Sequence, residues 1–278
     1  MRVGVFGDPA FGGVQLRGVQ VAEQMGWEFV PLDQLHQAGR FDFGIVVKYF
    51  GHHGQALRNI CGRLIYDPLD AWHQGNPNVY AHWWERFEAL QPDVVIATSP
   101  ACEAVMRLST MPATHLCTVA MIPHQPDARL MWVRDPQGPI VYDGELAYLG
   151  GEWKTIVAAA KRLGLRAKHG TAADRGQRMG VSLLLHPRLG RTATTINRYC
   201  KPQIKLANAA HCGLPVLATD DPAVMTLART VTVLPVSAWS DIDILEQAMR
   251  TAIDAEPVHP DLAFAHYGER LRKVMESL

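Results

Sequence analysis

The chain has 278 residues, 48% of them apolar and 19% charged, which is long enough to bury a core in one large domain or in two ordinary ones. Its formal charge is zero, which excludes a general electrostatic attraction to nucleic acid or to membrane surfaces. No run of eighteen apolar residues occurs, and the five scattered cysteines have neither disulfide-framework nor zinc spacing.

The first part of the chain alternates apolar strands with helical patterns. This alternation predicts right-handed crossovers and a doubly wound parallel sheet, in a domain that we assign to residues 1–130. The chain opens on a strand, RVGVFG, rather than on the apolar segment of a signal peptide, so we expect a cytoplasmic protein. The expected strands are residues 2–7, 28–31, 43–47, 63–66, 94–97 and 114–121, and the expected helices are 14–25, 54–60, 79–90 and 102–108.

The loop after the first strand carries Gly12 and Gly13. Its glycines do not follow the G-x-G-x-x-G spacing, so a dinucleotide-binding dehydrogenase is disfavoured. The loop still lies at the carboxyl end of a strand, where open parallel sheets bind ligands. An ordinary strand-to-helix turn is the alternative for this loop.

Residues 123–138 are rich in proline and charge and have no clear period, which indicates a linker. A second alternating series follows, in a domain that we assign to residues 131–260, and residues 261–278 form a final amphipathic helix. The expected strands begin at Ile140, Arg166, Val181, Val216 and Thr230, and the expected helices are 153–163, 222–228 and 241–253, together with one that ends before Gly213.

The stretch from Lys201 to Asp221 joins a helix, a turn and a buried strand. We expect Gly213 to end the helix with a positive φ and the strand to begin at Val216. Lys205 and Asn208 are three apart and share the helix face near its N-terminus, where amide groups and the helix dipole favour an anion. A packing helix with one exposed lysine is the alternative.

A basic segment precedes this helix. It has no acidic residue along eighteen positions, so it is suited to a dianionic leaving group, with a solvated basic loop as the alternative. The sequence has no H-E-x-x-H or EF-hand pattern; Asp241 and Asp243 spell D-I-D at a helix start, where we expect a cap rather than a metal ligand. The basic residues are Arg188, Arg191, Arg198, Lys201 and Lys205.

Candidate catalytic groups lie in the first domain. His52 and His53 stand between glycines after the strand that ends at Val47, so at least one of them can face a cleft as a sugar-orienting group or a base. Asp67 and Asp70 follow another strand and are the competing bases. A purely structural role is the alternative for the histidines.

The pattern P-x-x-K-L-x-N-A-x-x-C-G-L-P-V-L-A-T, from residue 202 to residue 219, resembles the nucleotide-sugar signature K-x-x-E-x-x-A-x-G-x-P-V-V-A of GT-B glycosyltransferases, in particular the GT4-like retaining enzymes. The resemblance implies two Rossmann-like domains facing each other across a cleft, with the C-terminal helix returning to the first. It also implies that Lys205 and Arg188, in a basic segment that includes Arg191, contact the donor diphosphate. Asn208 stands where the family has its ribose-binding acid, and Gly12 and Gly13 match the loop over the donor phosphates.

The expected activity is therefore metal-independent transfer of a sugar from a nucleoside-diphosphate sugar, with UDP favoured, to a hydroxyl acceptor. No cofactor is expected besides this co-substrate. The acceptor stays open between a glycan, a small metabolite and a modified DNA base, and so does the choice between retention and inversion. The alternatives are a phage-type DNA glycosyltransferase, a nucleotide-sugar epimerase of the same fold and a non-catalytic nucleotide-sugar-binding protein.

Overall fold

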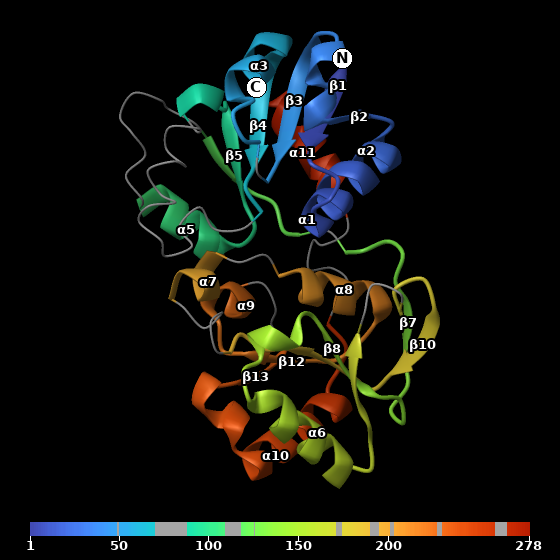
Figure 1. Cartoon of the computed structure of the whole chain (residues 1–278). Helices are drawn as coiled ribbons and strands as arrows, with labels where there is room; N and C mark the ends of the chain where they lie inside the picture. The colour runs from blue at the N-terminus through green and yellow to red at the C-terminus, as the bar shows by residue number, and fades with distance from the viewer. Residues whose placement is uncertain are drawn as a thin grey trace. The chain divides into compact units, whose positions relative to one another are not determined.

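The computed structural model describes residues 1–48, 50–69, 88–108, 118–124, 126–170, 174–189, 195–200, 203–226, 230–258 and 266–278 (Figure 1). The chain divides into two compact units. Unit 1 comprises Met1–His124, Cys200–Pro202 and His266–Leu278, and unit 2 comprises Gln125–Tyr199 and Gln203–Ala265. The first boundary between the units thus follows residue 124, whereas the predicted domain ranges, 1–130 and 131–260, placed it after residue 130. No helix within the described residues is long and apolar enough to cross a bilayer.

Unit 1 is built on a parallel sheet with the strand order β2-β1-β3-β4-β5-β6. Strands such as β1 and β5 are buried along their whole length, as their continuous apolar runs predict for a sheet covered on both faces. Because β1 pairs with β2 on one side and β3 on the other, the strand order reverses between β1 and β3. The strands are β1 (Val3–Gly7), β2 (Glu28–Pro31), β3 (Phe41–Val47), β4 (Cys61–Asp67), β5 (Val94–Ala97) and β6 (Thr118–Met121).

The helices of unit 1 follow the predicted order. The expected helix over residues 14–25 is present as α1 and α2 joined by a π-helical turn over Gln15–Val19, and Gly26 ends it with φ 66°. A 3₁₀ turn over Leu32–Gln37 follows β2. Most of the helix expected over residues 79–90 lies outside the described residues. The helices described before β6 are α1 (Gly12–Val14), α2 (Gln20–Met25), α3 (Gly54–Ile60) and α5 (Pro100–Leu108).

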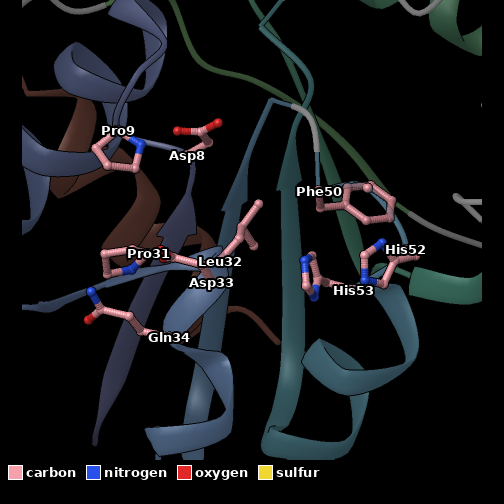
Figure 2. Close-up of a pocket in the computed structure, with 10 residues that line it drawn as sticks. Asp8, Pro9, Pro31, Leu32, Asp33, Gln34, Phe50, His52 and His53 are labelled. Atoms are coloured by element: carbon pink, nitrogen blue, oxygen red, sulfur yellow. The ribbon is translucent and has the colours of Figure 1, made fainter.

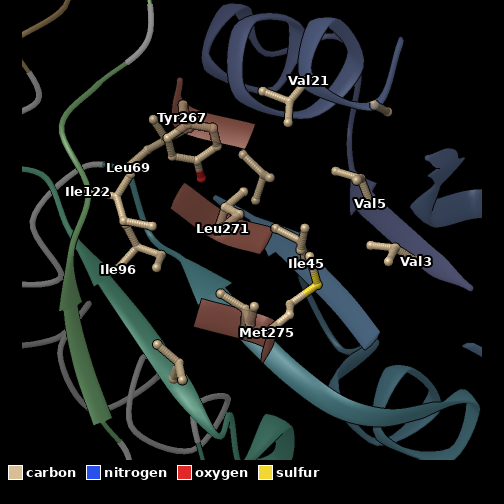
Figure 3. Close-up of a cluster of buried hydrophobic side chains, with 14 of the residues drawn as sticks. Val3, Val5, Val21, Ile45, Leu69, Ile96, Ile122, Tyr267, Leu271 and Met275 are labelled. Atoms are coloured by element: carbon tan, nitrogen blue, oxygen red, sulfur yellow. The ribbon is translucent and has the colours of Figure 1, made fainter. Parts of the chain in front are cut away.

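The C-terminal helix α11 (Tyr267–Glu276) belongs to unit 1, in agreement with the predicted return of this helix. Tyr267, Leu271 and Met275 are spaced by four residues, so they form one apolar stripe that packs into the unit 1 core (Figure 3). In Figure 1, α11 (red) accordingly lies among the blue elements of unit 1. The Tyr267 hydroxyl also donates a hydrogen bond to the Asp67 carboxylate, which holds Arg17 Nε at 2.7 Å.

Unit 2 has the parallel order β13-β12-β11-β8-β9, so its strand order reverses between β8 and β11. Helices α6 and α10 pack on one face of this sheet and α8 packs on the other (Figure 1). The strands are β8 (Ile140–Asp143), β9 (Ala167–Gly170), β11 (Leu183–His186), β12 (Val216–Thr219) and β13 (Thr232–Leu234). The helices are α6 (Glu152–Arg162), α7 (Thr195–Cys200), α8 (Ile204–Cys212), α9 (Pro222–Met225) and α10 (Ile242–Asp254), with 3₁₀ turns over Leu146–Tyr148 and Val236–Ser240.

Two expectations for unit 2 were wrong in detail. The segment expected to be a linker contains strand β7 (Met131–Arg134), which pairs in parallel with β10 (Arg178–Val181) in a separate two-stranded sheet. The single strand expected over residues 181–186 is therefore split, and Ser182 marks the break by donating its N–H to the Pro139 carbonyl. A four-residue strand with only Trp132 buried carries too short an alternation to be recognised from sequence.

Candidate functional site

The first candidate site lies at the carboxyl ends of β8 and β11, where the strand order of unit 2 reverses. Ligands of open α/β sheets bind at such points. Tyr142 stands near the end of β8, Arg188 follows β11 by two residues, and Lys205 lies in the first turn of α8. The Lys205 Nζ lies 5.3 Å from the centre of the Tyr142 ring, and the Arg188 guanidinium is close enough to lower the pKa of that phenol. The structure therefore brings Lys205 and Arg188 to the same tyrosine.

Helix α8 presents Lys205 for reasons visible in its sequence. Leu206, Ala209 and Ala210 are buried against the sheet, and Gly213 ends the helix with φ 62°, as predicted. Its N-cap residue, Gln203, makes no capping hydrogen bond, because its side chain is buried and bonded to His186 instead. An N-terminus without a side-chain cap suits an external anion.

Arg188 is buried and paired within the protein. Its Nε lies 2.9 Å from Asp221 Oδ2, and its backbone N–H donates to Thr219 Oγ1 at 3.2 Å. Arg198 Nε donates to the other Asp221 oxygen at 2.8 Å, and Arg198 also contacts Asp220. The basic segment is thus free of acids along the sequence but not in space, because the end of β12 brings two aspartates beside it.

Burial governs the ionisation of this site. It raises the pKa of Asp221, and the Arg198 and Arg188 guanidinium groups offset only part of that rise. Burial likewise raises the pKa of Tyr142 to about 12; Asp143 adds to the rise and Arg188 opposes it. Tyr142 is therefore a neutral phenol at physiological pH, and burial disfavours the charged form of Asp221.

Asn208, expected to face the ribose, lies inside unit 2. Its side chain is fully buried, and its Oδ1 accepts a hydrogen bond from the Asp127 backbone N–H at 2.9 Å. Its Nδ2 is also buried and has no hydrogen-bond partner among the residues that the structure describes. Asp127 is in turn paired with Arg129 and Arg175 at 2.8 and 3.3 Å. In this structure Asn208 holds the loop after residue 125 in place.

The second candidate site is a cavity of about 480 Å³ in unit 1, at the carboxyl ends of β1, β2 and β3. Figure 2 shows Asp8 and the segment from Pro31 to Gln34 on one side, with Phe50, His52 and His53 on the other. The cavity therefore adjoins the point between β1 and β3 where the strand order of unit 1 reverses. Its described lining residues are Asp8, Pro9, Pro31, Leu32, Asp33, Gln34, Phe50, Gly51, His52 and His53.

The histidine pair lies at this cavity. The rings of His52 and His53 have their centres 4.2 Å apart. Partial burial lowers the pKa of His53 below its ordinary value of 6.5, His52 lowers it further, and the nearby Asp33 carboxylate opposes both. His53 is therefore an uncharged imidazole at neutral pH, able to accept a proton from a ligand hydroxyl.

The remaining predicted residues of unit 1 fall into two groups. Gly12 and Gly13 begin α1; a Cβ on Gly12 would meet no described residue within 4 Å, whereas one on Gly13 would meet Leu69 at 2.7 Å. Only Gly13 therefore has a packing reason to be glycine. Asp67 is fully buried and engaged by Arg17 and Tyr267, and it does not line the cavity. Its carboxylate contacts the π-helical turn that precedes α2, helix α11 and the Leu69 N–H.

Two further predicted residues, Asp70 and Arg191, lie outside the described residues. The structure in turn adds Asp8, Asp33 and Asp221, which the sequence analysis did not single out. Asp8 directly follows β1, and Asp33 and Asp221 stand two residues after the ends of β2 and β12. Position at a strand end was the available signal, because the carboxyl ends of parallel strands meet at one edge of the sheet.

Comparison with known proteins adds evidence on the fold. No protein-family model matches the chain, and no curated protein sequence matches it. Among solved structures, AviGT4, a glycosyltransferase involved in avilamycin A biosynthesis, aligns over 100% of this chain and 96% of its own, at 12% identity and a TM-score of 0.58. The lipopolysaccharide outer core galactosyltransferase WaaB aligns over 100% and 99%, at 11% identity and a TM-score of 0.54.

A third structure, an E. coli trehalose-6-phosphate structure bound with UDP-2-fluoro glucose, aligns over 100% of this chain and 96% of its own, at 9% identity and a TM-score of 0.51. At such identities the likeness concerns the fold. The chain therefore has the GT-B glycosyltransferase fold, which confirms the expected class of two Rossmann-like units with parallel sheets.

Proposed function

We propose that this protein is a glycosyltransferase that moves a sugar from a nucleoside-diphosphate sugar, preferably a UDP-sugar, to a hydroxyl acceptor without a bound metal ion. The observation that carries the proposal is the approach of Lys205 and Arg188 to Tyr142 at the reversal point of unit 2. The fold shared with known glycosyltransferases supports it. UDP is favoured because a solved structure of this fold holds UDP-2-fluoro glucose.

The chemistry follows from the charge that develops during transfer. As the bond between the sugar and the diphosphate breaks, negative charge accumulates on the departing phosphate oxygens. Lys205 reaches this position from the first turn of α8, where the helix dipole adds to its charge. Arg188 supplies a second cation with several donors. Two such groups perform the neutralising role that a divalent cation has in other phosphate sites.

On the acceptor side, the proposed base is His53. Its lowered pKa keeps the imidazole unprotonated at neutral pH, which is the form that accepts a proton from an attacking hydroxyl. His52, beside it, orients the acceptor or the transferred sugar. The cavity that both histidines line is the proposed acceptor site.

A second candidate, a non-catalytic nucleotide-sugar-binding protein, is favoured by one observation. Asn208, at the position of the family's ribose-binding acid, is buried and bonded to the Asp127 backbone. A protein of this kind would bind the donor without turning it over.

Donor turnover separates the two candidates. The purified protein is incubated in EDTA with UDP-glucose, UDP-galactose or UDP-N-acetylglucosamine. Two quantities are measured: the UDP released, and the fraction of the remaining nucleotide sugar that has been converted to an isomer. We expect slow UDP release from one donor, and loss of at least ~90% of that rate in Lys205→Ala, since one charged hydrogen bond contributes about 1.5–3 kcal/mol. Binding without release supports the binding protein; an isomerised nucleotide sugar supports an epimerase; a requirement for added Mg²⁺ contradicts metal independence.

A further inference from the structure

The cavity of unit 1 has a distinctive charge. Asp8 and Asp33 line it, and none of its described lining residues is a lysine or an arginine. Asp8 uses one carboxylate oxygen to accept a hydrogen bond from the Ala10 N–H at 2.9 Å, which fixes the direction of the group. Asp33 is exposed and close enough to His53 to affect its ionisation.

His53 does not neutralise these carboxylates at neutral pH. Burial and His52 hold the pKa of His53 below 6.5, so this imidazole is uncharged at neutral pH despite the opposing effect of Asp33. Among the described lining residues, the carboxylates of Asp8 and Asp33 are therefore not balanced by a lysine, an arginine or a charged His53. A phosphorylated ligand placed there would have its charge repelled rather than compensated.

The size and walls of the cavity fit a small sugar. Its volume of about 480 Å³ is within the range of roughly 300–1,000 Å³ found for small-molecule sites. Pro9 and Pro31 give it apolar surface against which the C–H groups of a sugar ring can pack. Gln34 and the two carboxylates supply the hydrogen-bonding groups for hydroxyls.

We propose that this cavity binds an acceptor that carries a protonated amine on a polyhydroxylated ring, with Asp8 and Asp33 holding the ammonium group. The assignment rests on the proposed glycosyltransferase function and specifies its acceptor class. A sugar phosphate and a DNA strand are both disfavoured as acceptors, because each would bring phosphates to a cavity without a lysine or arginine among its described lining residues.

The test compares three matched probes without any donor. Glucosamine, glucose and glucose 6-phosphate differ mainly in charge, and their affinities are measured by NMR titration at neutral pH and low ionic strength. We expect glucosamine to bind at least ~10-fold more tightly than glucose, and glucose 6-phosphate to bind more weakly than glucose. This preference should shrink at high salt, because salt screens partly exposed charges.

Substitution identifies the groups responsible. In Asp33→Asn, and independently in Asp8→Asn, the preference for glucosamine should fall to about twofold or less. Asp33 is exposed, so its substitution should leave the thermal unfolding midpoint of the protein essentially unchanged. Asp254→Asn, an exposed aspartate at the end of α10 in unit 2, is the matched control and should leave the preference unchanged.

The possible outcomes separate this inference from the donor assignment. Four results would overturn the inference. Glucose 6-phosphate could bind most tightly, glucosamine and glucose could bind equally, or no probe could bind. The fourth is that Asp33→Asn and Asp8→Asn both keep the full preference for glucosamine. UDP is titrated into the same preparation. UDP binding without an amine preference removes only the acceptor assignment, whereas an amine preference without UDP binding removes the proposed transferase function.

Discussion

The two candidate sites occupy equivalent places in two sheets of the same design. In unit 1 the strand order reverses between β1 and β3, and in unit 2 it reverses between β8 and β11. The first place carries Asp8, Asp33 and two histidines, whereas the second carries Lys205 and Arg188. The fold therefore provides two positions for a ligand, and the residues that follow the strands decide what each position can bind.

The sites also differ in how their charges are balanced. At the unit 1 site Asp33 is exposed at an open cavity, while at the unit 2 site Arg188 is buried against Asp221. The basic site thus carries its own counter-ion. A diphosphate that binds there must compete with Asp221 for Arg188. A cation that binds at Asp33 displaces no ion pair among the described residues.

The largest expected effect comes from removing that counter-ion. Asp221→Asn should destabilise unit 2 by about 3–5 kcal/mol, because it removes the buried carboxylate that pairs with Arg188 and with Arg198. The same change should tighten UDP binding severalfold, because a negative charge beside the phosphate site is lost. Thermal unfolding and calorimetric titration measure the two effects.

Asp220→Asn is the matched control for this prediction. Asp220 is partly exposed and, within the described part of the chain, its side chain pairs with Arg198 alone, so both effects should be small, within about 1 kcal/mol. If Asp221→Asn instead weakened UDP binding while Asp220→Asn did not, Asp221 would act by orienting Arg188 and the competition would be refuted.

A smaller effect is expected in unit 1, from the contact that fastens α11. Burial raises the pKa of Tyr267, so its hydroxyl stays protonated and donates to Asp67. Tyr267→Phe should therefore cost about 1.5–3 kcal/mol, the range for a hydrogen bond to a charged group. UDP affinity should not change, because this contact lies in unit 1.

Chemical denaturation, with amide hydrogen exchange measured separately in each unit, checks this prediction. Ser277→Ala, which removes an exposed hydrogen bond at the end of the same helix, should change stability by less than ~0.5 kcal/mol. Equal effects of the two variants would show that the buried Tyr267–Asp67 contact does not hold the helix.

The smallest effect concerns His53. Because its pKa is already lowered, its NMR titration midpoint should lie below 6.5, and the imidazole should protonate only as the pH falls further. Asp33→Asn removes a carboxylate that raises this pKa, so the midpoint should move down. His52→Gln removes a neighbour that lowers it, so the midpoint should move up. Shifts of the same sign in both variants would contradict the observed arrangement of the three groups.

The fold could be read from the sequence where local signals were strong. The continuous apolar run of β5 (Val94–Ala97) and the helix α3 (Gly54–Ile60) lie where they were predicted, and Gly213 has the expected positive φ. Asp241 caps α10 as expected, accepting hydrogen bonds from the N–H groups of Asp243 and Ile244. Each of these features depends on a few residues adjacent in the sequence.

Features that depend on distant residues could not be read in this way. The pairing of Arg188 with Asp221 needs β11 and β12 to be neighbours, and the burial of Asn208 needs the loop at Asp127 to fold over α8. The cavity unites residues that follow three separate strands, so neither Asp8 nor Asp33 showed a local motif. The sequence indicated His52 and His53 as candidates, and their common position became visible only in the fold.

The central claim is that unit 2 holds a nucleoside diphosphate at Lys205. Isothermal titration with UDP, GDP, ADP and CMP in EDTA tests it directly, on the native protein, on Lys205→Ala and on Lys154→Ala, an exposed lysine of α6. The account predicts binding of one nucleoside diphosphate, weakened at least ~10-fold (about 1.4 kcal/mol) by Lys205→Ala and unchanged by Lys154→Ala. Binding of none of the four, or binding unaffected by Lys205→Ala, would contradict it.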